Sequence, residues 1–223
     1  MEAILNKSNI IKGLFVTFEG IDGAGKSSQI AKLKKNFKKH KINKVLFTRE
    51  PGGTLFGNKI RKLLVNNNNK NEKLSNQAEL LLLLAARNEH IIKVIKPYMI
   101  RNYIVICDRF IDSTYAYQCR GDNKLKALYS KLNKLIINDF CPNLTFLLDI
   151  SPDLALKRIK KRKVNNELDK LNKSHFTKIR ESYLRLAQNN KRICVVDATK
   201  DINALQEEII DKILIEFNHK NAF

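Results

Sequence analysis

The sequence predicts an α/β fold with three layers, in which a five-stranded parallel sheet lies between two layers of helices. Five short apolar runs, rich in β-branched and aromatic residues, recur along the chain at residues 14–19, 44–48, 103–107, 144–149 and 192–196. They are continuously apolar rather than alternating, which is typical of strands that are buried on both faces. Helical patterns separate them, and this order favours parallel pairing with helices on both sides of the sheet.

The segments between the strands carry the helix signals. We expect helices over residues 26–40, 56–65, 75–99, 125–140, 152–162, 175–190 and 201–217. In the sixth of them, Phe176, Ile179, Tyr183 and Leu186 recur at helical spacing, which makes one apolar face toward a core. The chain of 223 residues has no internal repeat and no linker, so we expect a single domain over residues 1–223.

One short stretch departs from a composition that is otherwise poor in glycine. Residues 20–27 read GIDGAGKS and lie between the first predicted strand and the first predicted helix, as a phosphate-binding loop requires. Glycines allow a tight turn whose backbone N–H groups converge on phosphate oxygens, and the helix N-terminus adds partial positive charge. The pattern predicts nucleotide binding, with Lys26 on the terminal phosphates and the Ser27 hydroxyl on a magnesium ion.

We expect ATP to contact the whole loop and the serine that follows it. These residues are Gly20, Ile21, Asp22, Gly23, Ala24, Gly25, Lys26, Ser27 and Ser28.

The loops after the second and third predicted strands are the next richest in side chains that can bind ligands or take part in chemistry. They read REPGGT and DRFIDSTYAYQ. Because ligands bind at the carboxyl ends of parallel strands, all three loops should share one site. Arg49 and Arg109 follow these strands, and we expect both to hold an acceptor phosphate, since a guanidinium matches phosphate bidentately. Glu50 and Asp108 are the acids best placed to hold magnesium through water. Glu19 ends the first strand, and we expect it to brace the loop.

These stretches resemble a known family. In order and spacing they are similar to bacterial thymidylate kinase over residues 12–216, and the matching stretches are FEGIDGAGKSSQ, FTREPGGT, AELLLLLAAR, DRFIDSTYAYQ and FTKIRESYLRLA. The resemblance implies a P-loop kinase fold and transfer of the ATP γ-phosphoryl group to dTMP, with Mg²⁺ as the cofactor. It also implies a homodimer, for which the long apolar helix from residue 75 offers a surface. A cytoplasmic location is expected on other grounds, because the sequence shows neither a run long enough for a membrane span nor an N-terminal signal pattern.

The resemblance further assigns roles around the acceptor. It implies that Asp22 contacts the 3′-hydroxyl of the deoxyribose, that Arg87 contacts thymine, and that Tyr117 fills the space of a ribose 2′-hydroxyl. The expected acceptor set is Asp22, Arg49, Arg87, Arg109, Thr114, Tyr117 and Gln118. At Leu83 the family generally has an aromatic residue that stacks on thymine, so only apolar contact is expected here.

A basic segment at residues 157–175, KRIKKRKVNNELDKLNKSH, lies between two predicted helices. The resemblance implies a short flexible lid here, which would close over the phosphates and exclude water. The phosphate loop has no arginine of its own, so we expect Arg158 or Arg162 to add charge at the transition state, beside Lys26 and Arg109. A solvated, charged helix face is the alternative interpretation.

The formal net charge of +20 would suit a protein that binds nucleic acid. However, Lys and Asn are abundant throughout, as in NNNNKNEK at residues 66–73, and no basic stripe with interleaved aromatic residues occurs. A compositional bias is therefore the favoured explanation, and we expect no nucleic-acid partner. The longest apolar run, residues 80–86, is far shorter than the roughly 20 residues of a membrane span, so we expect no membrane partner.

Two other functions stay open at this point. The first is a kinase for another nucleoside monophosphate, such as dUMP or UMP, although Tyr117 argues against ribonucleotides. The second is a non-enzymatic, nucleotide-dependent module that binds nucleic acid, which would show an affinity sensitive to salt.

Overall fold

The computed structural model describes residues 11–65, 74–138, 140–161 and 172–222. Its centre is a five-stranded sheet in the order β2-β3-β1-β4-β5, and every neighbouring pair is parallel. The strands are Leu14–Glu19 (β1), Val45–Arg49 (β2), Ile104–Asp108 (β3), Leu144–Asp149 (β4) and Ile193–Asp197 (β5). The five predicted strands are confirmed, each with its ends shifted by at most one residue.

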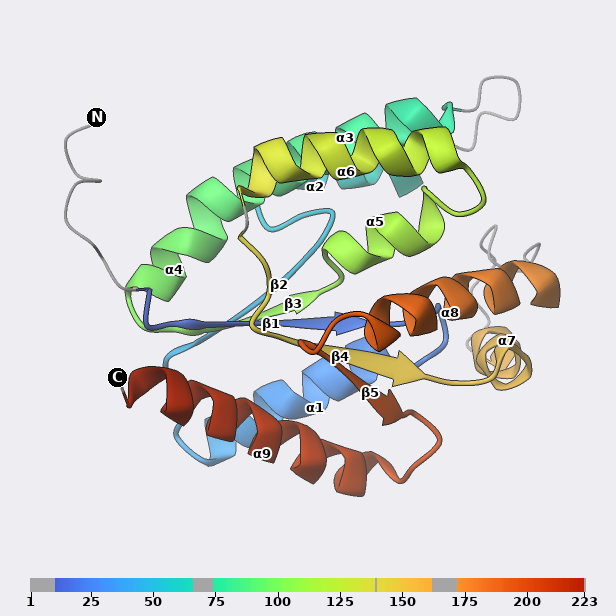
Figure 1. The fold of residues 1–223 in the computed structure, drawn as a ribbon. Helices are drawn as coiled ribbons and strands as arrows, with labels where there is room; N and C mark the ends of the chain where they lie inside the picture. Colours follow the sequence, from blue (N-terminus) through green and yellow to red (C-terminus); the bar gives the residue numbers. More distant parts are fainter. Residues whose placement is uncertain (1–10, 66–73, 139, 162–171, 223) are drawn as a thin grey trace, which may run out of the picture.

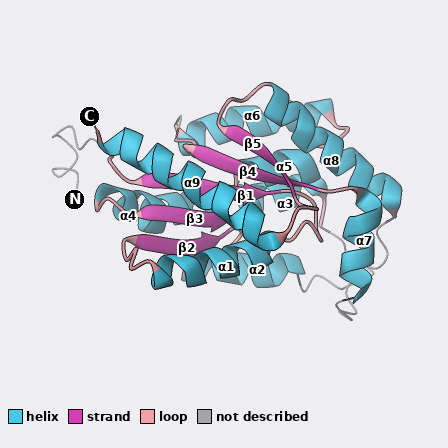
Figure 2. Ribbon diagram, turned by 90° about the horizontal axis from the view of Figure 1, so that it is seen from below, coloured by secondary structure: helices cyan, strands magenta, loops and turns pink. Residues whose placement is uncertain are grey.

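Helices cover both faces of this sheet, as Figures 1 and 2 show. They are α1 (Lys26–Lys39), α2 (Leu55–Val65), α3 (Asn76–His90), η1 (Ile91–Ile95), α4 (Lys96–Ile100), α5 (Ile111–Tyr117), α6 (Asn123–Ile137), α7 (Pro152–Lys161), α8 (Lys173–Gln188) and α9 (Ile202–Asn221). In Figure 1, α1 and α9 lie below the sheet, and α3, α5 and α6 lie above it. The predicted three-layer α/β fold is confirmed. Of the helices that the structure describes, none has the length and hydropathy of a membrane span.

The side chains of β1 show why the molecule has helices on both sides. Leu14, Val16 and Phe18 are fully buried in a core shared with α1 and α9. Phe15 points to the opposite face, where its ring meets that of Phe110 edge to face at 4.9 Å. Because both faces are apolar, the strand reads as a continuous hydrophobic run. Glu19, also fully buried, is the last residue of the strand and leads into the site.

The sequence predicts one continuous helix over residues 75–99, and the structure divides it. Helix α3 ends at His90, the π-helical segment η1 follows, and α4 carries Pro97 in its first turn. Proline has no N–H for the carbonyl four residues back, and its ring clashes with that carbonyl. A wider π turn accommodates such a residue, so the break belongs to Pro97 and falls directly after His90.

Helix α5 was missed by the sequence analysis. Its seven residues, IDSTYAY, are too few to show a helical period, and their β-branched and aromatic side chains favour a strand. Tertiary contacts hold the helix instead: the Tyr129 hydroxyl donates to the Ile111 carbonyl at 2.8 Å, and Arg192 pairs with Asp112 at 2.7 Å. This short helix brings Thr114 and Tyr117 to the carboxyl end of the sheet.

Candidate active site

The glycine-rich loop joins β1 to α1 and has the geometry of an anion site. Gly25 caps α1 in a left-handed conformation, with no side-chain cap and no acidic residue in the first turn. The first N–H groups of the helix therefore keep their partial positive charge. Gly23 has a φ of 82°, and a Cβ at this position would press on the backbone of Ala155 in α7. A glycine is required there for both reasons.

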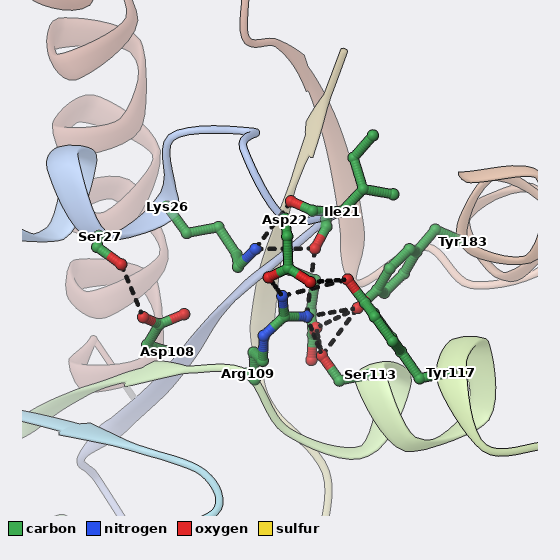
Figure 3. A network of polar contacts seen from close by, with 11 residues as sticks. Ile21, Asp22, Lys26, Ser27, Asp108, Arg109, Ser113, Tyr117 and Tyr183 are labelled. Atoms are coloured by element: carbon green, nitrogen blue, oxygen red, sulfur yellow. Dashed lines mark hydrogen bonds and ion pairs between the residues drawn. The ribbon is translucent and has the colours of Figure 1, made fainter. Parts of the chain in front are cut away.

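Lys26 is almost completely buried at the start of α1. Its Nζ donates to the carbonyl oxygens of Gly20 at 2.9 Å and Ile21 at 3.0 Å, as Figure 3 shows. Burial, and then the charge of Arg109, lowers the pKa of Lys26 to about 8. An anion in the loop would offer this ammonium a stronger partner than two carbonyls and would favour its charged form.

Ser27 and Asp108 form the part of the site that fits a divalent cation. The Ser27 hydroxyl donates to Asp108 Oδ2 at 3.3 Å, across the gap between α1 and the end of β3. Asp108 Oδ1 is buried and has no hydrogen-bond partner within the described part of the chain. A buried carboxylate oxygen without a partner is costly, and Mg²⁺ prefers carboxylate and hydroxyl oxygens together with water. These two side chains therefore fit the expected cofactor.

Arg109 lies at the centre of Figure 3. Its backbone has a φ of 71°, a conformation uncommon outside glycine that clusters at functional sites. Its guanidinium donates to Asp22 at 2.6 Å and to the Tyr117 hydroxyl at 3.3 Å, and that hydroxyl donates to the second oxygen of Asp22 at 3.0 Å. Burial alone would raise the pKa of Asp22, but the charges of Arg109 and Lys26 outweigh it and hold the pKa below its usual value.

Glu19 supports this arginine from the sheet. Its Oε2 accepts from Ser113 Oγ at 2.5 Å and from the Tyr183 hydroxyl at 3.0 Å, while Arg109 donates to Ser113 at 3.0 Å and to Tyr183 at 3.3 Å. Burial raises the pKa of Glu19 to about 7. Glu19 was expected to brace the glycine-rich loop, but its partners lie after β3 and in α8, so it braces the loop of Arg109 instead. Ser113 was not predicted as a site residue, and Tyr183 was predicted to lie in the core because it belongs to the apolar face of its helix.

A cavity of about 360 Å³ opens beside Arg109, and this volume suits a small-molecule ligand. Six of the predicted acceptor residues line it: Asp22, Arg87, Arg109, Thr114, Tyr117 and Gln118. Leu64, Val65 and Leu83 supply an apolar wall. The cavity therefore offers apolar surface on one side and cations on the other.

Arg49, the seventh predicted acceptor residue, does not line this cavity. It lies beside a neighbouring surface cavity together with Lys59, Arg61 and Lys62. Arg61 lines both cavities, and burial, together with the charge of Arg49, lowers its pKa. The sequence analysis missed Arg61. Its place in the sequence could have indicated it, because Arg61 belongs to the helix that directly follows REPGGT, one residue after Ile60.

Arg87 lies in the wall of the cavity, 2% exposed, with its guanidinium over the Phe110 ring. Its Nε donates to Glu50 Oε2 and its NH2 group to Thr114 Oγ1, both at 2.8 Å. The remaining NH1 group is buried and has no partner among the residues described. Glu50 was expected at the magnesium ion. Instead, one of its oxygens accepts from Arg87 and the other from His90 at 3.0 Å, so Glu50 belongs to the acceptor wall.

The predicted lid coincides in part with helices. Residues 157–161 form the last turns of α7, and α8 starts at Lys173. Arg158 donates to the Ala198 carbonyl at 3.0 Å and lines a cavity of about 180 Å³ beside the glycine-rich loop. Its NH1 group also lies 3.5 Å from the Ala24 carbonyl of that loop, so Arg158 lies beside the expected site of the ATP phosphates, and its transition-state role stays a prediction. Arg162 lies outside the described residues.

Comparison with known proteins identifies the family of this chain. The family model for thymidylate kinase matches residues 18–209. The chain belongs to the thymidylate kinase family. A thymidylate kinase of Mycoplasma capricolum is 41% identical over 206 residues, which are 91% of this chain and 95% of the relative. A thymidylate kinase of Wolbachia pipientis is 41% identical over 204 residues, 90% of this chain and 100% of the relative.

Solved structures agree with this assignment. The crystal structure of thymidylate kinase from Ehrlichia chaffeensis is 35% identical in sequence, covers 91% of this chain and 98% of its own, and superposes with a TM-score of 0.70. The resemblance stated from the sequence is confirmed, and the chain is an enzyme of the nucleoside monophosphate kinase class. In this kinase, Asp22 and Arg109 lie where the glycine-rich loop meets the acceptor cavity, so anions bound on the two sides would face each other there.

Proposed function

We propose that the protein transfers the γ-phosphoryl group of ATP to dTMP and releases dTDP and ADP. One observation carries the proposal: Asp22 of the phosphate-binding loop pairs with Arg109 at 2.6 Å, and both residues line a cavity large enough for a small-molecule ligand. Membership in the thymidylate kinase family supports dTMP as the acceptor. The alternatives, a kinase for dUMP or UMP and a nucleic-acid-binding module, receive no support from the comparisons.

On the donor side, residues 20–28 bind the ATP phosphates through backbone N–H groups and the α1 N-terminus. The Lys26 ammonium leaves the carbonyls of Gly20 and Ile21 and binds the terminal phosphates. Ser27 and Asp108 would hold a Mg²⁺ ion, which would supply charge neutralisation of the phosphates. Arg158 contributes to the wall around the rest of the nucleotide.

On the acceptor side, Arg109 and Arg61 hold the phosphate, and Arg49 approaches it from the neighbouring cavity. Asp22 accepts from the 3′-hydroxyl of the deoxyribose. The free NH1 group of Arg87 donates to an oxygen of the thymine ring, and Leu83 packs against the ring.

Discrimination against ribonucleotides follows from the same cavity. Tyr117 holds Asp22 by a hydrogen bond of 3.0 Å and stands where a 2′-hydroxyl would enter. Thr114 and Gln118 complete this wall, and Gln118 is itself fixed by Glu79 at 3.1 Å.

Catalysis in this arrangement consists of positioning and charge neutralisation, as in other phosphoryl transfers. Lys26 and Arg109 flank the path of the phosphoryl group, so both stabilise the charge that spreads over its oxygens. Arg158 and Arg162 stay our candidates for a further cation from the lid. A homodimer, which the family resemblance implies, and a cytoplasmic location are part of the same proposal.

Coupled ADP release with Mg-ATP tests the proposal, with dTMP, dUMP, UMP, AMP and dCMP offered separately. The expected result is activity with dTMP well above that with the other acceptors, and a loss of about a hundredfold or more in Lys26→Ala. Lys35→Ala, an exposed lysine of the same helix, serves as the matched control. ADP release that is independent of any acceptor, or an active Lys26→Ala variant, would refute the proposal.

A further inference from the structure

His90 is fully buried behind the acceptor cavity, at the last residue of α3, and no step described so far uses it. Both of its ring nitrogens have partners: Nδ1 lies 3.0 Å from Glu50 Oε1, and Nε2 lies 2.8 Å from Thr48 Oγ1. A carboxylate oxygen only accepts, so Nδ1 carries a proton and donates it to Glu50. In the neutral ring, Nε2 then accepts from the Thr48 hydroxyl.

Glu50 links His90 to Arg87 by hydrogen bonds. It is 4% exposed, and its second oxygen accepts from Arg87 Nε at 2.8 Å. Each carboxylate oxygen thus has a different partner, so the bond from His90 fixes the plane in which Arg87 is held. With Nε bound to Glu50 and NH2 to Thr114, NH1 is the guanidinium nitrogen of Arg87 that has no partner among the described residues. The direction of NH1 therefore depends on His90 through one intervening side chain.

The backbone packs closely around the His90 ring. A Cβ on Gly53, in the turn after β2, would overlap the imidazole, so this turn packs directly on the ring. The π-helical segment starts at the next residue, Ile91. Such turns occur frequently at functional sites.

We propose that His90 is a positioning residue, which acts through Glu50 to aim Arg87 at the base of the acceptor. The inference rests on the proposed function and adds a residue to its specificity. Without the Nδ1–H donor, the Glu50 carboxylate is free to rotate and NH1 loses its direction. The affinity for the base then falls, while the phosphate loop on the other side of Arg109 is unchanged.

A matched pair of substitutions tests this. The amide nitrogen of asparagine reaches the position of His Nδ1, whereas that of glutamine reaches the position of Nε2. His90→Asn therefore keeps the donor to Glu50, and His90→Gln loses it. We expect His90→Gln to raise the KM for dTMP about tenfold with an unchanged KM for ATP, and His90→Asn to stay near the wild type. His40→Gln, which changes an exposed histidine after α1, is the control.

A second readout separates positioning from a merely structural role. The monophosphate 5-methyl-dCMP carries an amino group where dTMP has a ring carbonyl, so Arg87 rejects it only while NH1 is aimed correctly. We expect His90→Gln to reduce the kcat/KM preference for dTMP over 5-methyl-dCMP about tenfold, with His90→Asn retaining it. A general loss of structure would lower both acceptors alike, and thermal melting of each variant would reveal it.

The outcomes are distinct. Equal effects of the two substitutions, or none from His90→Gln, in an otherwise active kinase would overturn the inference alone. No acceptor phosphorylation by the wild type would refute the proposed function and the inference with it. Should His90→Gln fail to fold, Glu50→Gln replaces it, because an amide cannot accept from His90 and Arg87 together; an unchanged acceptor preference in that variant would also overturn the inference.

Discussion

Two ionisable side chains of the site have pKa values near neutral pH, and each has a physical cause in its surroundings. Lys26 is desolvated close to Arg109, which disfavours its charge. Glu19 is desolvated at the end of β1, where three donors do not fully compensate for the loss of water. The first group makes activity depend on pH and the second makes stability depend on pH, so the two effects can be measured separately.

For Lys26, we expect kcat/KM for ATP to fall as pH rises through about 8, the pKa of the free enzyme. Below that pH the ammonium is charged and binds phosphate, and above it the neutral amine does not. Initial rates between about pH 6.5 and 9.5 measure the profile. Lys26→Arg, which stays charged, should remove this decline even if its overall rate is lower; a decline that persists in Lys26→Arg would assign it to another group.

For Glu19, burial raises the pKa from its ordinary value of 4.5 to about 7 in the folded protein. Between these values the folded state binds a proton that the unfolded state has released, so the free energy of unfolding falls as pH rises. Glu19→Gln removes this dependence. Relative to the wild type, the variant should therefore gain on the order of 3 kcal/mol between about pH 5 and 8. Denaturant unfolding at both pH values measures it, and a constant difference would contradict the shift.

At the scale of elements, strands were predictable and the breaks in helices were not. The inner strands β1 and β3 are buried on both faces, so a continuous apolar run marks them in the sequence. The edge strands β2 and β5 are partly exposed, but their runs are apolar enough to be recognised as well. Helix α5 has no such mark, because a hydrogen bond from Tyr129 and an ion pair with Arg192, both far along the chain, hold it. In the sequence, Pro97 indicated a break in the helix predicted over residues 75–99. The π turn that accommodates the proline forms only in the packed structure, so the sequence did not predict it.

The residues of the site divide in the same way: those in local sequence motifs were predicted, and those that only the fold brings together were not. Loop residues such as Lys26 and Arg109 were found because their motifs are local. Arg61, Ser113 and Tyr183 were missed because only the fold brings their helices to the cavity and to Glu19. Glu50 was placed at the metal because its sequence neighbours suggested it, whereas its partners come from α3.

Helix α8 contributes to the site through one hydroxyl, and this can be tested. Tyr183→Phe removes a hydrogen bond to Glu19 and one from Arg109 while keeping the ring in the core. We expect kcat/KM for dTMP to fall about fivefold, with little change in melting temperature. Tyr98→Phe, which keeps its ring contact with Tyr103, is the control. Equal activity of the two variants would show that α8 only packs against the site.

At the scale of the whole molecule, our hypothesis is that the net charge of +20 reflects a compositional bias and not a polyanionic partner. Several cations gather at the site itself, where Arg49, Arg61, Arg87 and Arg109 surround the acceptor side. A strongly positive protein attracts small anionic substrates over distances set by the ionic strength. The three loops that carry the chemistry meet at one end of the sheet because all five strands are parallel.

Two results are expected from this charge distribution. Association with dTMP, measured as kcat/KM, should weaken as salt is raised. Duplex or single-stranded DNA should not inhibit the enzyme at physiological salt, which competition assays with short oligonucleotides measure. Tight DNA binding under these conditions, with a steep salt dependence, would revive the nucleic-acid-binding alternative.

The most direct test of the proposed reaction is chromatographic detection of dTDP after incubation of the purified protein with Mg-ATP and dTMP. We predict dTDP and ADP in equal amounts, with dTDP formation lost in Lys26→Ala. Formation of ADP without dTDP would mean that the phosphoryl group passes to water, and it would contradict the assignment of the cavity beside Arg109 as an acceptor site.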